Sequence, residues 1–526
     1  MVENEHFIEL LRTLCPKVAV PHSSLCLDNL RGMKERLDQE VRLRLISQHV
    51  GVTSDAWTSS NNVTYMSFTC TYITASFELE ALCLECRKHE GRTTSDDLAE
   101  GVKTMINRNG MKGRVVSITT NCQSSMVKAC HLLQESEGVT HVGCFCHRLE
   151  SITSQAFDGP GISKALALAR GVVLRYTMSS QASDRLEQMC GIVQITSKKV
   201  TQDVETTWSS TYATICRLLY LRRPITEHER IDSIAPLLQE RDWEVLRLVE
   251  PLLKPFMTAQ KHLEAPKEVT ASLVVPYIAD LRDELEEAVE NLKAQPRLPD
   301  SIATEAKRDV LLCAEALQTD LGRRWGDGKN KEQVLATALD PRSKSLYGID
   351  EDEQPGVWEA VANAAVEVAL EPKAAERTQS AGASSSPISV KPAPPQPQRR
   401  RGFAAAALAH GAKQHSAVAS SLDSRHQLES IVNRELESFK TTPGIGVSWE
   451  DKGQLVRGKP LEWWRVKARE YPMLASLARR VLCIPASQAQ SKRVFSSGGL
   501  VGTNTRSRLD PENVELMVLL RNILPE

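Results

Sequence analysis

A single carboxylate lies where a metal-dependent enzyme would hold one. Asp55 belongs to the run VTSDAWTS, at the end of a β-rich stretch that begins at Val50 and predicts a strand. Carboxylates at strand ends can bind the divalent ions that activate phosphoryl transfer, but such a site needs several oxygen ligands from distant parts of the chain. Taken alone, Asp55 is explained more simply as a turn cap.

Two short motifs could supply softer metal ligands. Cys83 and Cys86 enclose a Leu-Glu pair on an expected strand, and Cys144 and His147 enclose a Phe-Cys pair after another. If the fold joined them, they could offer zinc its preferred thiolates and imidazole. Buried thiols and a packed histidine explain the same residues better. They are weak zinc candidates, and we expect no cofactor.

The elements that would position Asp55 form a mixed α/β unit over residues 49–156. Three alternating runs, VGVTSDAWTS, TYMSFTCTYIT and SFELEALCLEC, predict neighbouring antiparallel strands. A helix at 95–107, a strand at 114–121, a helix at 124–134 and a strand in THVGCFCHRL follow. This order is that of an RNase H-like fold, which gathers carboxylates at strand ends, although other α/β arrangements share it.

The remaining chain predicts helices and one unstructured linker. Residues 1–48 carry amphipathic helical patterns, and residues 157–371 are long amphipathic stretches without a strand signal, which predicts an all-helical insertion. Residues 372–420 are rich in Pro, Ser, Ala and Gln, a composition typical of a disordered linker. Helical patterns resume over residues 421–526.

Composition limits the class of protein. The 526 residues are 41% hydrophobic and 25% charged, with a net charge of -1, which argues against nucleic-acid binding over the whole surface but allows a local basic face. Thirteen cysteines, scattered and odd in number, fit a reducing compartment. No apolar run approaches the roughly 20 residues of a membrane span, so we expect no membrane partner.

The stretch from Trp463 to Asn522 combines apolar helical faces with positive charge. From Ser476 to Leu509 it has six Lys or Arg and no Asp or Glu. Its apolar residues exceed what a short helical region can cover, so some should pack on the core and the rest should form a dimer patch. We expect dimerisation through Trp463, Trp464, Leu474, Leu477, Val481, Val514, Met517, Val518 and Leu520.

An ordered series of motifs in this stretch resembles a known family. The WW opening, YPMLASLARRVLCIPAS, RVFSSGG and RSRLDPENVE stand in the order and at the spacing of the C-terminal dimerisation region of hAT-family DNA transposases of the BED-finger group. The resemblance implies an RNase H-like core, interrupted by a large helical insertion and completed by the C-terminal region. Residues 1–48 lack the cysteine and histidine pairs of the BED finger that relatives often carry.

The resemblance also implies three acidic metal ligands, of which this chain keeps one. Asp55 matches the first acid. The second falls on Asn121 in SITTNCQSSMVKAC, and the third on Lys492, just before RVFSS. An amide brings no charge and an ammonium repels metal ions, so we expect a catalytically dead centre in which Lys492 pairs with Asp55.

Family motifs also suggest where DNA would bind. DVETTWSSTY resembles a motif whose Arg-Trp pair holds the DNA end; Trp208 keeps the tryptophan, but Thr207 replaces the arginine. A core aromatic is an equally good interpretation of Trp208. The candidate DNA-binding residues are Trp208, Arg479, Arg480, Arg493, Arg506 and Arg508.

These patterns together predict a domesticated or degenerate transposase-like protein without catalytic activity. We expect it to form a homodimer, to lie in the nucleus, and to associate with DNA or chromatin in a role related to transcription. Two alternatives stay open. One is an active, Mg²⁺-dependent transposase, and the other is a nonfunctional transposon copy.

Overall fold

A computed structural model describes most of the chain in one mixed α/β assembly. The described residues are 8–9, 13–14, 23–58, 63–89, 94–204, 207–294, 302–325, 330–371, 424–445, 447–449, 455–501 and 511–523. The expected linker at 372–420 therefore lies outside them, as do Arg506 and Arg508. Helices dominate, and none of those described is long and apolar enough to cross a bilayer.

The N-terminal part contains the larger sheet and the helices that pack on it. Its elements are α2 (Ser23–Leu45), β1 (Val50–Thr58), β2 (Thr64–Ile73), β3 (Leu79–Lys88), α3 (Ser95–Arg108), β4 (Val115–Thr120), α4 (Ser124–Glu137) and β5 (Thr140–Gly143). The predicted order of three strands, helix, strand, helix and strand is confirmed. Thr94 caps α3 by accepting the Asp97 N–H at 3.3 Å.

The five strands lie in the order β3-β2-β1-β4-β5. β1, β2 and β3 are antiparallel neighbours, as predicted, and β4 and β5 run parallel to β1. Parallel neighbours end at the same edge of a sheet, so the ends of β1 and β4 come together. The topology thus assembles one site from residues far apart in sequence.

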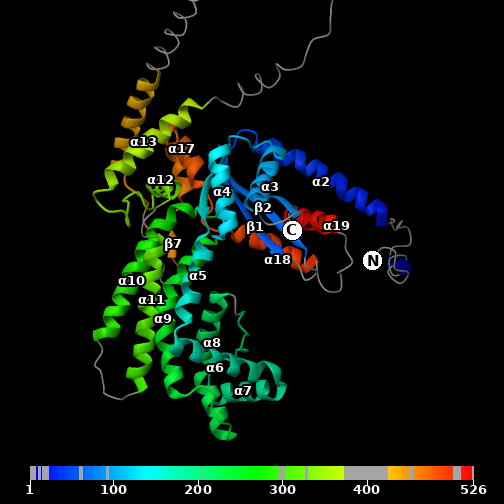
Figure 1. The fold of residues 1–526 in the computed structure, drawn as a ribbon, viewed down its shortest axis with the longest axis vertical. Helices are drawn as coiled ribbons and strands as arrows, with labels where there is room; N and C mark the ends of the chain where they lie inside the picture. The colour runs from blue at the N-terminus through cyan, green and yellow to red at the C-terminus, as the bar shows by residue number, and fades with distance from the viewer. Residues whose placement is uncertain are drawn as a thin grey trace, which may run out of the picture.

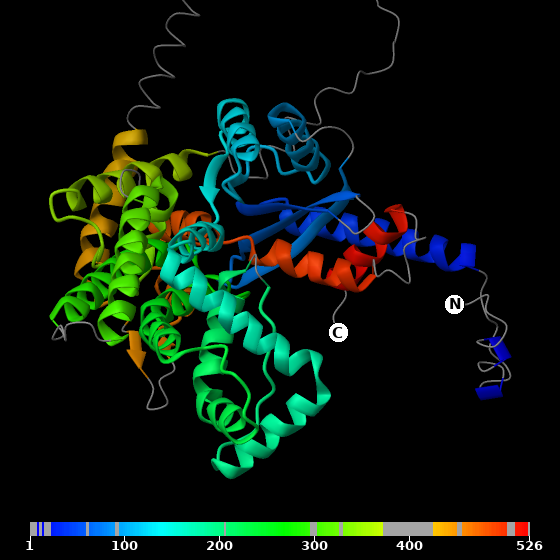
Figure 2. The same ribbon diagram turned by 60° about the horizontal axis from the view of Figure 1, so that its bottom comes forward.

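Each face of the sheet is covered by different helices. On one face, residues such as Val52, Cys70 and Ile118 pack in a core with α2, α3 and α4. On the other, the chain before α18 (Ala489–Val501) crosses the strands, so the sheet lies between α3 and α4 on one side and α18 on the other (Figures 1 and 2). A Cβ at Gly51 would lie 2.8 Å from Pro485 Cδ, so only glycine allows this close approach.

A helical layer continues from the sheet and has its own core. It consists of α5 (Phe145–Phe157), α6 (Pro160–Met178), α7 (Ser180–Ile192), α8 (Trp208–Ile231), α9 (Glu240–Leu263), the short 3₁₀ helix η1 (Ala271–Leu273), α10 (Val274–Ala294) and α11 (Ile302–Trp325). Trp208, Trp243 and Phe256 are among its buried residues. The predicted helical character of this part of the chain is confirmed; its limits as a domain stay a prediction.

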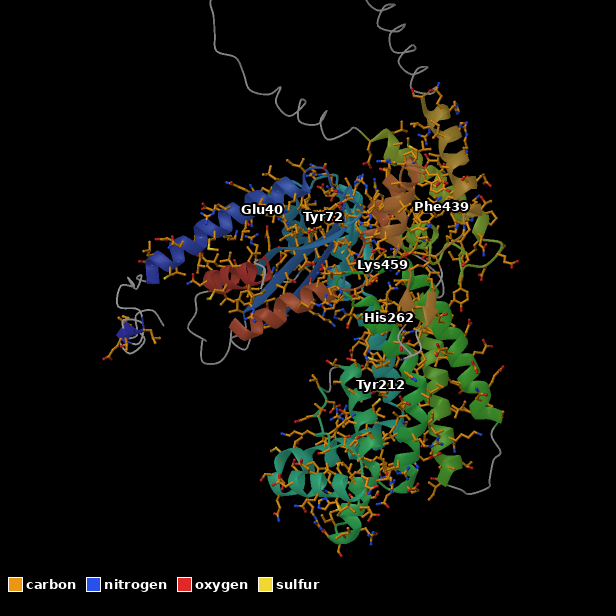
Figure 3. The ribbon with its side chains drawn as sticks, turned by 180° about the vertical axis from the view of Figure 1, so that it is seen from behind. Glu40, Tyr72, Tyr212, His262, Phe439 and Lys459 are labelled. Carbon is orange, nitrogen blue, oxygen red and sulfur yellow. The ribbon has the colours of Figure 1, made fainter. Side chains whose placement is uncertain are left out.

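A third group of helices joins the ends of the chain to the middle. It comprises α12 (Lys331–Leu339), α13 (Gln354–Leu370), a helix at 424–441, the short strands β6 (Val447–Trp449) and β7 (Leu455–Arg457), α16 (Pro460–Lys467) and α17 (Pro472–Leu482). Phe439 lies where the helix at 424–441 meets the other helices of this group (Figure 3). The last helix, α19 (Pro511–Ile523), packs on β3 and lies near α2 (Figure 1).

One helix end that the sequence indicates is absent. The Gly498-Gly499 pair predicts that the preceding helix ends there, but this prediction is wrong, because α18 continues through both to Val501. Glycine lowers helix stability by only about 1 kcal/mol relative to alanine and removes no backbone hydrogen bond. The predicted cap of the last helix, Asp510, lies outside the described residues.

Candidate functional site

Asp55 lies near the end of β1, level with the end of β4. Thr53 pairs with Thr119 of β4, so two residues further on Asp55 comes level with Asn121, just past the end of β4. Because side chains alternate along a strand, Asp55 lies on the same face of the sheet as Thr53. The Thr53 hydroxyl lies 2.7 Å from the Ser491 hydroxyl on α18. The Asp55 and Asn121 positions therefore reach one end of the sheet, beside α18.

The amide of Asn121 is used in local structure. Its Oδ1 accepts a hydrogen bond from the Gln123 backbone N–H at 3.3 Å, and its backbone oxygen accepts one from the Thr120 hydroxyl at 3.0 Å. These bonds shape the turn from β4 into α4. The side chain at this position is therefore uncharged and already engaged.

Lys492 lies at the same end of β1 as Asp55. Gln488 binds the Ser54 carbonyl oxygen through its side-chain amide and accepts the Lys492 backbone N–H at 3.0 Å, which places Lys492 at this end of β1. Burial raises the pKa of the Asp55 carboxyl, and the charge of His147 lowers it more than that of Lys492 does. Asp55, Asn121 and Lys492 are therefore brought to one end of the sheet, and His147 adds a second basic side chain there. The pairing of Lys492 with Asp55 stays a prediction.

His147 and Cys144 form a polar pair at the start of α5. Cys144 is the N-cap of α5 and its sulfur accepts the Gln488 N–H at 3.3 Å. Burial opposes ionisation of Cys144, yet hydrogen bonds from Cys146, His147 and Gln488 lower the pKa of this thiol well below its ordinary value. Burial likewise disfavours protonated His147, but Cys144 raises the pKa of the imidazole above its ordinary value. The two pKa values thus shift toward each other, because each group stabilises the charged form of the other.

A second carboxylate, Glu150, lies on the same helix. Its Oε1 accepts the backbone N–H of Trp208 at 2.8 Å, which ties α5 to the start of α8. Burial raises the pKa of Glu150, and the Trp208 N–H and the charge of Lys492 lower it. Glu150 could not be identified from the sequence, because nothing along the chain connects it to Asp55. Its only sequence signal is its position one turn after the Cys-Phe-Cys-His motif.

The two halves of the hypothetical zinc site lie in different places. Cys83 and Cys86 pack with Val494 and Val518 under α18 and α19, whereas Cys144 and His147 adjoin Asp55. A bulge in the β2–β3 pairing, where Thr69 pairs with Cys83 and Phe68 with Glu85, lets two cysteines three residues apart share a face. Within the described ranges, no group of three or more His, Cys, Asp or Glu could hold a metal ion.

The site does not fit the pair of magnesium ions that the resemblance implies. Two-metal chemistry needs several converging oxygen ligands with negative charge. Here Asp55 offers a carboxylate, Asn121 an amide already bonded to Gln123, and Lys492 a positive charge that opposes a divalent ion. No step through a metal ion can be derived from this set of side chains.

The candidate DNA-binding residues are mostly engaged within the chain. Trp208 is 2% exposed and belongs to the helical core, so the core interpretation is correct and a direct DNA contact is not open to it. Arg480 pairs with Glu371, and Arg493 donates to the Glu264 carbonyl oxygen. Burial lowers the pKa of Arg479, which is only part-exposed. Fewer of these arginines are therefore available to bind DNA than the sequence suggests.

Most of the expected dimer patch lies inside a single chain. Seven of the nine residues are buried, namely Trp464, Leu474, Leu477, Val481, Val514, Val518 and Leu520. Trp463 and Met517 are part-exposed. The expectation underestimated how much apolar surface the rest of the chain covers, because α13, the helix at 424–441, β3 and the loop after β2 all pack against this region.

Comparison with protein families supports the resemblance in three segments. The model described as "hAT family C-terminal dimerisation region" matches residues 435–524. Models described as "ZBED1 RNase-like domain" and "ZBED1 RNase-like helical domain" match residues 53–142 and 142–251. The first two of these segments contribute Lys492 on one side and Asp55 and Asn121 on the other, so the site lies where the matched regions meet.

Individual relatives span nearly the whole chain at low identity. A maize protein named "Putative AC transposase" is 24% identical over 557 residues, covering 99% of this chain and 63% of its own length. Human "Zinc finger BED domain-containing protein 4" is 24% identical, covering 100% of this chain and 42% of its own length. Rice "Zinc finger BED domain-containing protein RICESLEEPER 2" is 21% identical over 90% of this chain and 65% of its own. The chain thus spans less than two thirds of each.

Proposed function

Because the chain is a homologue of the hAT transposases and the BED zinc finger proteins, we propose that it is a transposase-derived protein that has lost catalysis. It keeps an RNase H-like core as a scaffold, self-associates through the region at 435–524, and associates with DNA or chromatin in the nucleus. The observation that carries this proposal is the set of charges around Asp55. Of the three positions that the resemblance assigns to acidic ligands, one keeps a carboxylate, one carries an amide and one carries an ammonium group.

The strand order supports the RNase H-like core. Three antiparallel strands are followed by two parallel ones in the order β3-β2-β1-β4-β5, and the connections from β3 to β4 and from β4 to β5 use the helices α3 and α4. In such a sheet the ends of β1 and β4 are adjacent, which is where carboxylates of a metal site would be placed. The core therefore has the strand arrangement that a metal site needs, but the side chains at the strand ends are not the carboxylates that would bind the metal ions.

The proposal predicts no metal-dependent DNA cleavage. With Mg²⁺ or Mn²⁺, the purified chain should nick DNA carrying hAT terminal repeats no faster than the Asp55→Ala variant does. The measurement is gel analysis of end-labelled DNA across a metal titration. Cleavage above background that Asp55→Ala abolishes would contradict the proposal and favour an active transposase, because an intact site depends on that carboxylate.

A double variant tests whether the parent has lost its binding site for divalent ions. Restoring acids with Asn121→Asp and Lys492→Glu changes the local charge by three units toward the negative, which favours binding of divalent ions. We expect Mn²⁺ to stabilise this double variant against thermal unfolding and to leave the parent unchanged. An equal shift in both would show that the parent already binds the ion.

Self-association is proposed through a smaller surface than the sequence suggested. Val466 on α16 is 74% exposed, and part-exposed Trp463 lies one turn earlier on the same helix face. Both belong to the matched region at 435–524. An exposed apolar pair on a short helix, close to a packed aromatic cluster, is a suitable centre for a two-fold interface.

Sedimentation tests this surface. The parent is expected to run as a dimer at micromolar concentration and Val466→Asp as a folded monomer, because an unpaired charge in an apolar interface is strongly unfavourable. Leu312→Asp on α11 is the matched control, since Leu312 is also an exposed apolar side chain (55%) but lies outside the matched region. A monomeric parent, or a Val466→Asp variant that stays dimeric, would refute this assignment.

A further inference from the structure

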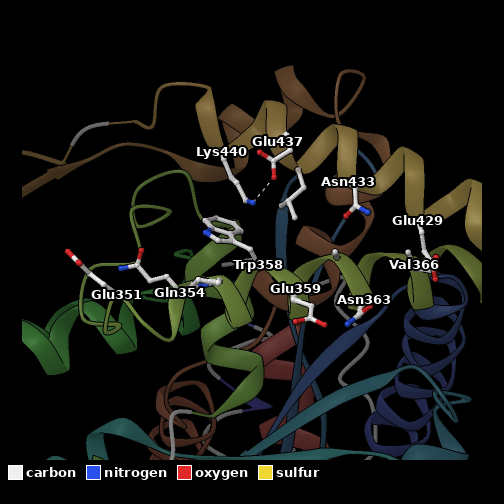
Figure 4. Close-up of a pocket in the computed structure, with 13 residues that line it drawn as sticks. Glu351, Gln354, Trp358, Glu359, Asn363, Val366, Glu429, Asn433, Glu437 and Lys440 are labelled. Carbon is white, nitrogen blue, oxygen red and sulfur yellow. Dashed lines mark hydrogen bonds and ion pairs between the residues drawn. The ribbon is translucent and has the colours of Figure 1, made fainter.

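A groove lies between the last described helix before residue 372 and the first one after residue 423. Its walls are α13 and the helix at 424–441, and its volume is about 770 Å³ (Figure 4). The two walls are thus the two ends of a single excursion of the chain. Residues 372–423 connect these two walls, so a side chain of this segment lies close to the groove along the chain.

The groove is acidic. Its lining includes four glutamates and one lysine. Glu437 pairs with Lys440 at 2.8 Å and Glu429 with Arg425 at 3.1 Å. Glu351 and Glu359 are exposed and form no ion pair with any other described residue. The groove therefore keeps a net negative charge after its internal pairs are counted.

An aromatic side chain gives the groove a second feature that suits a cation. Trp358 of α13 is part-buried and packs edge-on against Phe439, with ring centroids 6.4 Å apart. The Lys440 ammonium already lies 5.5 Å from the centre of the Trp358 ring (Figure 4). A tryptophan face attracts guanidinium groups as well as ammonium groups, and carboxylates bind guanidinium through two parallel hydrogen bonds. Arginine matches both features.

The segment that joins the two walls carries the complementary charge. Residues 372–423 contain seven Lys or Arg and two Asp or Glu, a net charge of +5, with Arg399, Arg400 and Arg401 in succession within PPQPQRRRGF. Ion pairs with His49 at 3.3 Å and with Arg480 fix Glu371, where the segment begins. The 28 residues after Glu371, up to and including Arg399, can extend to at most roughly 100 Å, so this tether is long enough for the arginines to reach a groove built from their own flanking helices.

We propose that the basic run Arg399–Arg401 of this chain binds the acidic groove between α13 and the helix at 424–441. The tether holds the arginines at an effective concentration of about a millimolar, which favours this occupant over a free peptide. While the three arginines are bound in the groove, they cannot bind nucleic acid or a protein that recognises basic sequences. The groove therefore controls whether Arg399–Arg401 can bind such a partner.

Peptide competition in the full chain tests the proposal. The probe is a fluorescent peptide of residues 394–403, and the receptor is the full chain with all three arginines replaced by serine, which leaves the groove open. At low salt, anisotropy should show saturable binding that weakens as salt rises. The parent chain should bind the same peptide at least about tenfold more weakly, because its own arginines compete at high effective concentration.

A charge variant with a matched control assigns the binding to the groove. Glu359→Gln with Glu437→Gln, added to the arginine-free chain, should remove binding; both side chains are exposed, so folding should be unaffected. Glu286→Gln with Glu290→Gln on α10 removes the same charge elsewhere and should change nothing.

Each other outcome overturns the proposal. No binding by the arginine-free chain, or binding that survives the loss of Glu359 and Glu437, would show that the groove is not the receptor. Equal binding by the parent and the arginine-free chain would show that the groove is empty of its own segment and open to a basic peptide of another protein.

Discussion

Replacing Trp464 with alanine is expected to lower the free energy of unfolding by about 3–5 kcal/mol, as for other buried tryptophans. Trp464 is fully buried, and its ring stacks on Phe439, with centroids 5.5 Å apart and an interplanar angle of 16°. Its Nε1 donates a hydrogen bond of 2.8 Å to the Leu339 carbonyl oxygen. Phe77, from the loop after β2, lies 6.4 Å away on a nearly parallel plane. The variant therefore loosens four segments at once.

Two further substitutions divide this effect into its parts. Trp464→Phe keeps most of the stacking and leaves the Leu339 carbonyl unpaired, so it should cost about 1–3 kcal/mol, the penalty of one buried unsatisfied group. Val466→Ala, at an exposed site on the same helix, should change stability by less than about 0.5 kcal/mol. The measurement is chemical denaturation followed by circular dichroism. Equal losses for Trp464→Ala and Val466→Ala would contradict the role of Trp464 as the centre of this core.

Trp464 also shows what the sequence could and could not predict. The adjacent tryptophans Trp463 and Trp464 in α16 are a clear landmark in the sequence, and the helices around them follow from apolar spacing. The sequence did not reveal which surface they face, because Phe77, Leu339 and Phe439 are separated from Trp464 by 25 to 387 positions. Residues predicted to face a second chain therefore proved to face the rest of this one.

The candidate site divides in the same way. The end of β1 and the position of Asp55 follow from strand alternation, and the substitutions at Asn121 and Lys492 follow from ungapped motifs. The charge of His147 beside Asp55, and the contributions of Glu150 and Gln488, depend on how α5 and the chain before α18 approach the sheet. Periodicity describes each element separately, so contacts between them need the structure.

Asp340→Ala is expected to destabilise the chain by about 3–5 kcal/mol, the range for removing one partner of a buried ion pair. The Asp340 side chain is fully buried, and one of its oxygens accepts hydrogen bonds of 2.6 Å from both the Arg342 guanidinium and the Ser272 hydroxyl. The Arg342 side chain is itself 1% exposed. The Asp-Pro step at Asp340 indicates a turn, which the structure shows after α12, but the sequence pattern does not reveal that these charges are buried.

The loss of stability in Asp340→Ala should come mainly from the Arg342 guanidinium, which the substitution leaves buried without its carboxylate partner. Arg342 Nη1 already has no hydrogen-bond partner within the described residues and lies 3.9 Å from Glu268, so the guanidinium depends on Asp340 for compensation. Adding Arg342→Met removes the buried charge, and the double variant should recover part of the lost stability, because an apolar replacement of a buried pair is often nearly neutral. Asp352→Ala, at an exposed turn position, is the control, and its free energy of unfolding should stay within about 0.5 kcal/mol of the parent.

A double variant that is less stable than Asp340→Ala alone would contradict this explanation. It would show that the packing of Arg342 and its other bonds, such as the 3.1 Å bond to the Val269 carbonyl oxygen, stabilise the chain by more than its unpaired charge costs.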